Sequence, residues 1–222
     1  MCRWRNWSPI LCGASSCGGP GGKKESYQRR IWKTYRRESQ VIYPPVAVEA
    51  FAWKPPEDYY LIVSELVAYK RLDSAIRVFA KNGRKLRIAG DGPEFKALKR
   101  GAPANIEFCG RVSDDELRDL YARCRAFLMP GEEDFGITAV EALASGKPVI
   151  ALGRGGALEI VPLRDPTCGT FYREATDEAL AQAIEQWDAR ERDVDPEALQ
   201  AYAARFSEAE FARKMSAVLF AK

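Results

Sequence analysis

The sequence contains no histidine. This absence removes the commonest general base and excludes the Ser-His-Asp and Cys-His catalytic schemes. A mixed Cys/His zinc site is excluded for the same reason, and the six cysteines include no C-x-x-C pair. Any chemistry performed by this chain therefore depends on carboxylates, lysine, tyrosine or the substrate itself.

Long hydrophobic runs are absent too. No apolar segment approaches the ~18–20 residues that a membrane-spanning helix requires. Arg3 and Arg5 are not followed by a continuous apolar segment, so the N-terminus is a poor signal peptide. With 46% hydrophobic and 29% charged residues, the composition is that of an ordinary globular protein. We expect a cytoplasmic location, with peripheral association at the inner membrane face as a further option.

Charge is distributed unevenly. Residues 1–37 hold nine Lys/Arg and one acidic residue, Glu25, whereas the rest of the chain has an acidic excess. A basic arm is able to contact nucleic acid or an anionic membrane, but a solvated tail is the simpler interpretation. Residues 1–26 show no helical or strand period. We therefore expect a disordered or adventitious arm at 1–26 and one domain over 27–222.

Strand and helix patterns alternate from Val41 onward. Short β-rich segments predict strands at 59–64, 85–90, 105–110, 125–130, 148–152 and 169–173. Helical spacing predicts helices at 27–37, 72–83, 93–100, 113–124, 137–146 and 157–161, and three more over 176–191, 195–206 and 207–220. This alternation predicts an α/β fold, a Rossmann-like parallel sheet with helices on both faces and a helical C-terminus.

Ligands of such sheets bind at the carboxyl ends of the strands, where loops lead into helices. Four loops meet this description, at 64–71, 90–93, 110–114 and 130–137.

The fourth loop, GEEDFG, precedes a helix that we expect to begin near Ile137. Gly136 allows the backbone to approach a ligand closely. The N–H groups of Ile137, Thr138 and Ala139 are then expected to be free at the helix N-terminus, which is an anion site. The sequence therefore predicts a phosphate group here.

Two glutamates flank this anion site. Glu133 would repel phosphate, so it suits a neutral polyhydroxylated group beside it. Glu141 is four residues after Ile137, on the same side of the helix, where a carboxylate can accept both hydroxyls of a ribose. Together they fit a nucleotide-sugar. The alternative is an acidic helix cap at 132–134 with Glu141 facing solvent, and spacing alone does not decide between the two.

The other loops add charge and glycine. Lys70 and Arg71 lie near a strand-to-helix junction, where they either neutralise a diphosphate or form an ordinary surface pair. Gly90-x-Gly92 begins a dinucleotide fingerprint, but Phe95 stands where the third glycine belongs. A nicotinamide-dependent enzyme is therefore weakly supported, although the glycines still permit close backbone approach.

Six segments together resemble the motifs of one protein family: VIYPPV (41–46), VSELVAYKRLD (63–73), IAGDGPEFKAL (88–98), IEFCGRVSDDEL (106–117), EDFGITAVEALASGKPVIA (133–151) and GGALEIV (155–161). With them, the chain from about Gln28 onward resembles the C-terminal domain of the retaining group-1 (family 4) glycosyltransferases. Glu133 and Glu141 match that family's E-x7-E motif. The resemblance implies the C-terminal half of a two-domain glycosyltransferase B-type fold.

The resemblance also implies roles for individual residues. Lys70 and Glu133 would be catalytic, Lys70 at the diphosphate and Glu133 at the donor hexose, and Glu141 would bind the ribose diol. The sugar and diphosphate would meet backbone N–H groups of Phe135, Gly136, Ile137 and Thr138. The remaining donor-binding residues would be Ser64, Gly90, Gly92 and, at the nucleobase, Arg111 and Val112.

The implied reaction moves a hexose from a nucleoside diphosphate to an acceptor glycan or lipid-linked sugar, with retention at the anomeric carbon. No cofactor and no metal are implied, because cations and a helix dipole stabilise the leaving group, and no nucleic-acid partner is expected. GEEDFGI, with VS-x-L-V-x-Y-K before it, is similar to enzymes of surface-polysaccharide biosynthesis that often use GDP-mannose.

Two departures from the family pattern are present. Glu65 stands where the family usually has an arginine that would attract the diphosphate. The family's N-terminal domain, with its acceptor site and histidine, has no counterpart, so we expect a truncated transferase. Two other hypotheses remain: a non-enzymatic nucleotide-sugar-binding module or one half of a split enzyme whose N-terminal domain is a separate chain, and an interaction protein that uses its basic arm.

Overall fold

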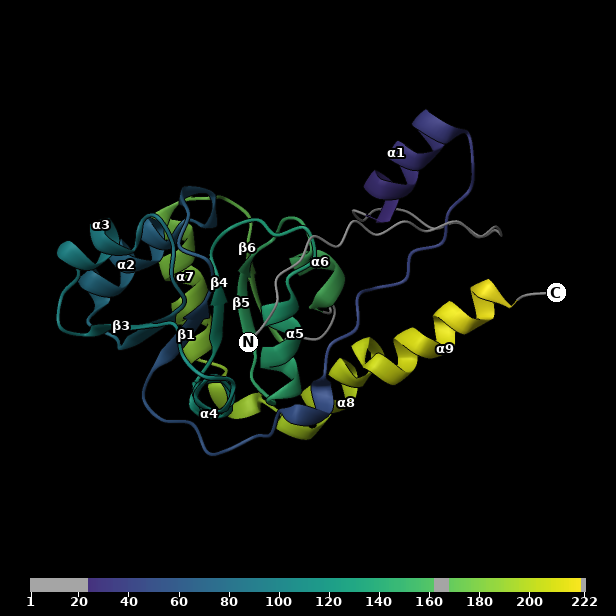
Figure 1. Ribbon diagram of the computed structural model, residues 1–222. Helices are drawn as coiled ribbons and strands as arrows, with labels where there is room; N and C mark the ends of the chain where they lie inside the picture. The colour runs from purple at the N-terminus through teal and green to yellow at the C-terminus, as the bar shows by residue number, and fades with distance from the viewer. Residues whose placement is uncertain (1–23, 162–167, 221–222) are drawn as a thin grey trace.

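The computed structural model describes residues 24–161 and 168–220. Its centre is a parallel sheet with the strand order β3-β2-β1-β4-β5-β6, shown in Figure 1. The strands are β1 (Tyr60–Val63), β2 (Leu86–Ala89), β3 (Ile106–Gly110), β4 (Phe127–Met129), β5 (Val149–Leu152) and β6 (Gly169–Tyr172). The predicted α/β fold with a parallel sheet is confirmed.

Helices connect and follow the strands. They are α1 (Lys24–Tyr35), α2 (Leu72–Asn82), α3 (Phe95–Arg100), α4 (Asp114–Arg123), α5 (Ile137–Ala144), α6 (Ala157–Ile160), α7 (Asp177–Asp188), α8 (Pro196–Ala203) and α9 (Glu208–Leu219). Short 3-10 helices are η1 (Val48–Ala50), η2 (Ala68–Lys70), η3 (Glu191–Asp193) and η4 (Ala204–Phe206). No helix within the two described ranges is long and apolar enough to cross a membrane.

Element boundaries differ slightly from the predictions. Helix α1 begins at Lys24, inside the expected arm, whose residues 1–23 lie outside the described part of the chain. Ser113 forms a capping box at the start of α4: its N–H donates to Glu116 Oε2 at 2.8 Å, and its hydroxyl accepts from the Glu116 N–H. Strand β4 is shorter than expected, since it spans only Phe127–Met129.

The core has one half on each face of the sheet. Helices α2 and α7 cover one face, where Phe79, Ile184 and Trp187 are fully buried. Helices α4, α5, α6 and α8 cover the other, with Val140 and Leu199 among the fully buried side chains. Burial on both faces explains why the central strands β1, β4 and β5 are continuous apolar runs rather than alternating ones.

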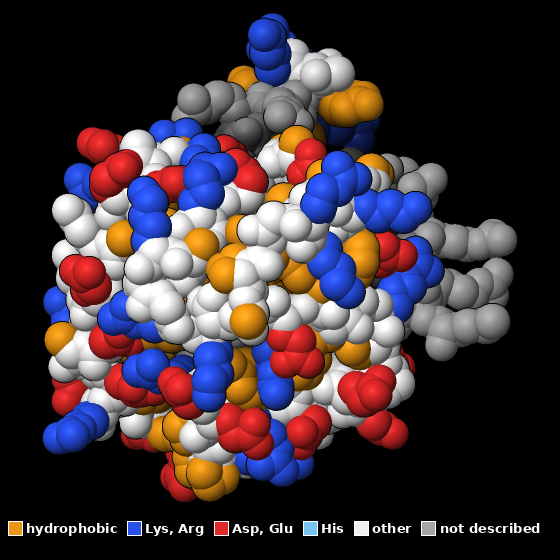
Figure 2. All heavy atoms as spheres, turned by 90° about the vertical axis from the view of Figure 1, so that its left-hand side faces the viewer, with side chains coloured by type: hydrophobic (Ala, Val, Ile, Leu, Met, Phe, Trp, Pro, Cys, Tyr) orange, Lys and Arg blue, Asp and Glu red, His pale blue; other side chains and the backbone are white. Residues whose placement is uncertain are grey.

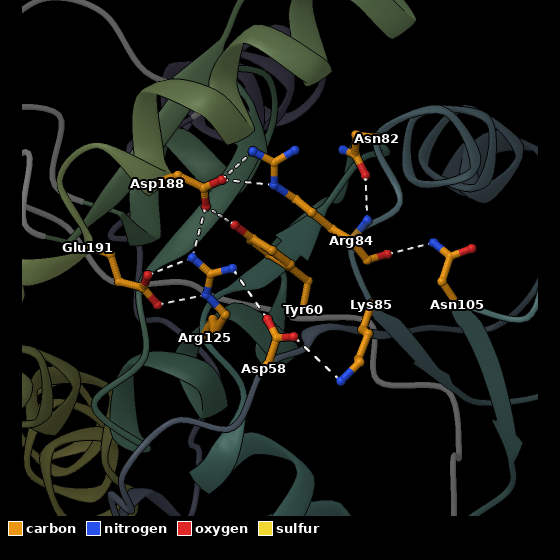
Figure 3. Close-up of polar contacts among 9 residues, drawn as sticks. All are labelled: Asp58, Tyr60, Asn82, Arg84, Lys85, Asn105, Arg125, Asp188 and Glu191. Atoms are coloured by element: carbon orange, nitrogen blue, oxygen red, sulfur yellow. Dashed lines mark hydrogen bonds and ion pairs between the residues drawn. The ribbon is translucent and has the colours of Figure 1, made fainter.

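A polar network closes the amino ends of the strands (Figure 3). Asp188, at the end of α7, accepts from Arg84 at 2.5 and 2.8 Å and from the Tyr60 hydroxyl. Arg125 donates to Asp188 at 3.2 Å and to Glu191 at 2.6 and 2.9 Å. The network therefore fastens the end of α7 to residues at the starts of β1, β2 and β4.

The surface on the α2–α3 side mixes charges of both signs. Figure 2 shows Lys/Arg and Asp/Glu side chains interspersed over this face, without a large area of one sign. Ion pairs accord with this mixture, such as Arg77–Asp73 on α2 at 2.7 Å and Arg87–Glu107 between β2 and β3 at 2.8 Å. This side of the molecule therefore offers no strongly charged surface for a polyanion.

Candidate functional site

The strand order reverses between β1 and β4, so their following loops part at the carboxyl edge of the sheet. In open α/β sheets this is where ligands bind. A small depression lies there. Its lining comes from β1, β4 and the loops after them: Ile62, Val63, Ser64, Lys70, Phe127, Leu128, Met129, Pro130, Gly131, Glu133 and Thr138.

Lys70 and Glu133 form an ion pair at this depression, with side chains only 13% and 22% exposed. Their loops approach closely because Gly131 has no side chain: a Cβ there would lie 2.6 Å from the Lys70 Cα. The Lys70 ammonium also lies 4.9 Å from the ring centroid of Tyr69, which is exposed. The two residues predicted to be catalytic are thus in direct contact.

Helix α5 begins at the same depression. Gly136 takes a left-handed conformation, φ 95°, that permits the sharp entry into the helix. Thr138 lines the depression, and Ile137 is 36% exposed. The prediction of three free N–H groups was wrong for Ala139, which donates to the Gly136 carbonyl at 2.9 Å. The tight first turn therefore leaves the amides of Ile137 and Thr138 for an anion.

The Phe135 ring packs away from the depression, in an aromatic cluster with Tyr43 and Phe206. It stacks on Tyr43 with centroids 5.5 Å apart and meets Phe206 edge-on at 5.9 Å. Gly156 approaches the same loop so closely that a Cβ would lie 2.0 Å from the Phe135 carbonyl oxygen. The Phe135 side chain therefore packs against the core beside this loop, and Phe135 does not line the depression.

Glu141 lies one turn into α5 and is partly buried rather than facing solvent. One carboxylate oxygen, Oε2, accepts a hydrogen bond from the Tyr121 hydroxyl at 2.9 Å. Burial raises the pKa of Glu141 to about 7, with a further increase from the Asp114 carboxylate and an opposing decrease from the Tyr121 hydrogen bond. This carboxyl therefore titrates near neutral pH.

The two glycines of the second loop pack against protein backbone. A Cβ at Gly90 would lie 1.9 Å from the Ser64 carbonyl oxygen, and one at Gly92 would lie 2.5 Å from the Leu66 carbonyl oxygen. The Leu66 N–H also donates to the Asp91 carbonyl at 3.0 Å. The two glycines thus allow a close approach of backbone, and the group that approaches them is the loop that contains Ser64 and Leu66.

Arg111 and Val112 lie beyond this depression, after edge strand β3. The Arg111 side chain is 85% exposed and its Nε lies 3.4 Å from Asp91 Oδ2. Glu65 is exposed and forms no ion pair with any described residue, because Lys70 pairs with Glu133 and Arg71 donates to the Ala175 carbonyl at 2.6 Å. Glu65 therefore pairs with neither Lys70 nor Arg71.

Of the predicted site residues, Ser64, Lys70, Glu133 and Thr138 line one depression. The others do not line it: Gly90, Gly92, Arg111, Val112, Phe135, Gly136, Ile137 and Glu141. Sequence reasoning missed Tyr121, although a tyrosine on a buried helix face signals a hydroxyl that needs a partner. Residues 24–161 and 168–220 contain no group of three His, Cys, Asp or Glu side chains suited to a metal ion.

Strand order and site together define the class of protein. The chain contains a doubly wound α/β domain with a lysine, free helix amides and two glutamates at or near its switch point. This is the arrangement of nucleotide-binding domains of the Rossmann type.

The sequence profile described as glycosyl transferases group 1 matches residues 46–206, so the chain belongs to this family. An uncharacterized glycosyltransferase of Methanocaldococcus jannaschii is 33% identical over 60% of this chain and 40% of its own length. A GDP-mannose-dependent alpha-mannosyltransferase of Corynebacterium glutamicum is 33% identical over 50% of this chain and 27% of its own. The chain thus spans less than half the length of these relatives.

Solved structures show the same fold. HepE of Anabaena, in complex with UDP and glucose, superposes with a TM-score of 0.71 at 22% identity, over 83% of this chain and 57% of that protein. The predicted glycosyltransferase B-type domain is confirmed at the level of the fold.

Proposed function

We propose that this chain is the donor-binding domain of a retaining glycosyltransferase. The bond between the anomeric carbon of a hexose and the nucleoside diphosphate breaks, and its electron pair leaves with the diphosphate. The acceptor hydroxyl transfers its proton to the oxygen of the departing diphosphate and bonds to the same face of that carbon. The observation that supports this most is Lys70 beside the free amides of Ile137 and Thr138, since both stabilise the leaving group's charge.

The glutamates divide the rest of the donor between them. In this proposal Glu133, held at the depression by Lys70, accepts hydroxyls of the hexose, and Glu141 accepts the ribose diol. The turn at Arg111 and Val112 meets the nucleobase, and the Phe135 and Gly136 backbone borders the sugar. Ser64, Gly90 and Gly92 shape the loops around the diphosphate.

The donor and acceptor are proposed by class. Some relatives are named as GDP-mannose-dependent, whereas HepE was solved with UDP, so GDP-mannose is our first donor and a uridine donor the second. The acceptor is a glycan or a lipid-linked sugar, and a lipid-linked one would bring the protein to the inner membrane face. Because the chain spans 40% of a relative's length, we assign acceptor binding to a second domain, in the same protein or in a separate chain. Family membership favours a glycosyltransferase domain over a non-enzymatic nucleotide-sugar-binding module.

Calorimetric titration of the full chain with UDP, GDP, UDP-glucose and GDP-mannose tests the proposal. We expect one nucleobase to bind, and Lys70→Ala to weaken that binding at least roughly tenfold because a charge-assisted contact is lost. Lys96→Ala is the matched control, since Lys96 is exposed on α3. If none of the four ligands binds, or if both variants behave alike, the proposal is wrong.

A further inference from the structure

Tyr121 is held rigidly beneath Glu141. The side chain is fully buried, its ring meets Phe51 edge-on at 5.7 Å, and it lies 5.7 Å from the Phe127 ring. The hydroxyl donates to Glu141 Oε2 at 2.9 Å. Because the ring is packed between Phe51 and Phe127, its hydroxyl has one fixed direction.

The Glu141 carboxylate is held at one oxygen only. Oε2 accepts from Tyr121, whereas Oε1 receives no hydrogen bond from any residue in the described ranges. The residue as a whole is only partly buried. A carboxylate oxygen has two lone pairs, and Oε2 therefore also retains one acceptor position.

We propose that Tyr121 is a positioning residue for donor binding: its hydroxyl orients the Glu141 carboxylate and keeps it ionised, so that it accepts both ribose hydroxyls. This inference rests on the proposed function. Tyr121 itself touches no ligand in this arrangement, because it is fully buried behind Glu141. It acts on affinity through the charge and direction of the carboxylate.

The electrostatic environment keeps the Tyr121 phenol protonated, so that it acts as a hydrogen-bond donor. Burial and the adjacent Glu141 carboxylate raise the pKa of Tyr121, so its phenol remains protonated and donates. The hydrogen bond in turn lowers the pKa of Glu141 against the effects of burial and of Asp114. These two α4 residues are the titratable groups that act on this carboxyl. Acidic side chains on other elements packed against α5 do not: Glu49, Glu159 and Glu197.

The hydrogen bond matters because a protonated carboxyl is a poorer acceptor for two hydroxyls than a carboxylate. Without the phenol hydroxyl, burial and Asp114 would keep Glu141 protonated to a higher pH. Donor affinity would then decrease near neutral pH and recover in alkaline solution. A purely structural role of Tyr121 would not produce such a pH-dependent loss.

The test compares Tyr121→Phe with Tyr59→Phe in the full chain. Tyr59 is a matched control, because it is also buried, and its hydroxyl donates to the Leu120 carbonyl at 2.8 Å without contacting Glu141. Carbon-detected NMR of glutamate carboxyls, without nucleotide, gives the Glu141 pKa in each variant. Titration with UDP and with GDP between pH 6 and pH 9 gives the affinities.

We expect Tyr121→Phe to raise the Glu141 pKa by at least about half a unit and to weaken nucleotide binding about threefold to tenfold at pH 7. The loss should shrink by pH 9, and Tyr59→Phe should show neither effect. An unchanged Glu141 pKa, or equal losses at every pH, would overturn the inference. If wild type binds neither UDP nor GDP, the proposed function fails, whereas the NMR result still decides whether Tyr121 controls Glu141.

Discussion

The Lys70 ammonium pairs with the Glu133 carboxylate across two loops that Gly131 allows to touch. The residue proposed to attract the diphosphate is thus partly neutralised by the residue proposed to bind the hexose. A diphosphate would compete with Glu133 for the same cation, because both are anions with acceptor oxygens. In the proposed arrangement Glu133 therefore weakens binding of the diphosphate and strengthens binding of the hexose.

The first prediction follows from that opposition. Glu133→Gln should tighten binding of plain UDP or GDP by roughly threefold, since Lys70 loses its competing carboxylate. The same substitution should weaken binding of the corresponding nucleotide-sugar, because the hexose hydroxyls lose a charged acceptor. Calorimetry with both ligands measures the two effects. Asp134→Asn, on the same loop and exposed, should change neither. Equal weakening of both ligands would contradict the roles given to Glu133.

The second prediction concerns Glu65, which follows Ser64 at the depression and has no described ion-pair partner. Glu65→Arg replaces repulsion of a diphosphate by attraction, and it should tighten nucleoside-diphosphate binding at least roughly tenfold at low salt. Because exposed charges are screened, the gain should diminish at higher ionic strength.

Glu185→Arg is the control for this charge reversal, since Glu185 is exposed on α7 and the change in net charge is the same. Titration of both variants at two salt concentrations measures the effect. No gain for Glu65→Arg at low salt, or the same gain for Glu185→Arg, would show that the 64–71 loop does not meet the diphosphate.

The third prediction concerns stability and pH. The pKa of Glu141 in the folded chain, about 7, lies above its ordinary value of 4.5. Between these values the folded protein binds more protons than the unfolded chain, so its stability decreases as pH rises and levels off above pH 7. Glu141→Gln removes that loss and keeps an acceptor for the Tyr121 hydroxyl.

This variant should therefore be more stable than wild type by about 1–3 kcal/mol at pH 8, and equally stable near pH 4.5. Thermal and urea unfolding at both values measure the difference, with the exposed Glu185→Gln as the neutral control. A gain that is the same at both pH values would refute the titration of Glu141. The stabilised variant should still bind nucleotide more weakly.

A fourth prediction tests the network at the amino ends of the strands. Asp188→Asn removes the carboxylate that Arg84, Arg125 and Tyr60 share, and it should destabilise the fold by about 2–3 kcal/mol. Asp119→Asn removes exposed ion pairs with Lys54 and Arg123 and should have little effect on unfolding. Urea denaturation compares the two. Because Asp188 is at the edge opposite the depression, nucleotide affinity should remain unchanged in both.

The sequence was sufficient for the fold and for part of the site. The alternation of apolar strands with amphipathic helices predicted the parallel sheet, and the loop rule placed Lys70 and Glu133 at one edge. Their direct contact was not predictable, because it depends on how two loops far apart in the chain pack around Gly131. No local pattern reports such long-range packing.

The glycines of the second loop also show that long-range packing is not predictable from local sequence. A glycine in a loop indicates that something approaches the backbone closely, but the sequence does not say what. At Gly90 and Gly92 it is the backbone of residues 64–66. Tyr121 was not among the predicted site residues, because its position beneath Glu141 depends on how α4 packs against α5.

The stacking of Tyr43 on Phe135 has a practical consequence for anyone excising this domain. The family match begins at Val46, so a recombinant fragment cut at that limit would lose Tyr43 while keeping Phe135 and Phe206. The loop at 130–137 would then lack one of its supporting rings, although every motif residue was retained. A fragment intended for binding studies should therefore begin upstream of residue 43. The segment matched by the family profile is therefore shorter than the segment that packs around the loop at 130–137.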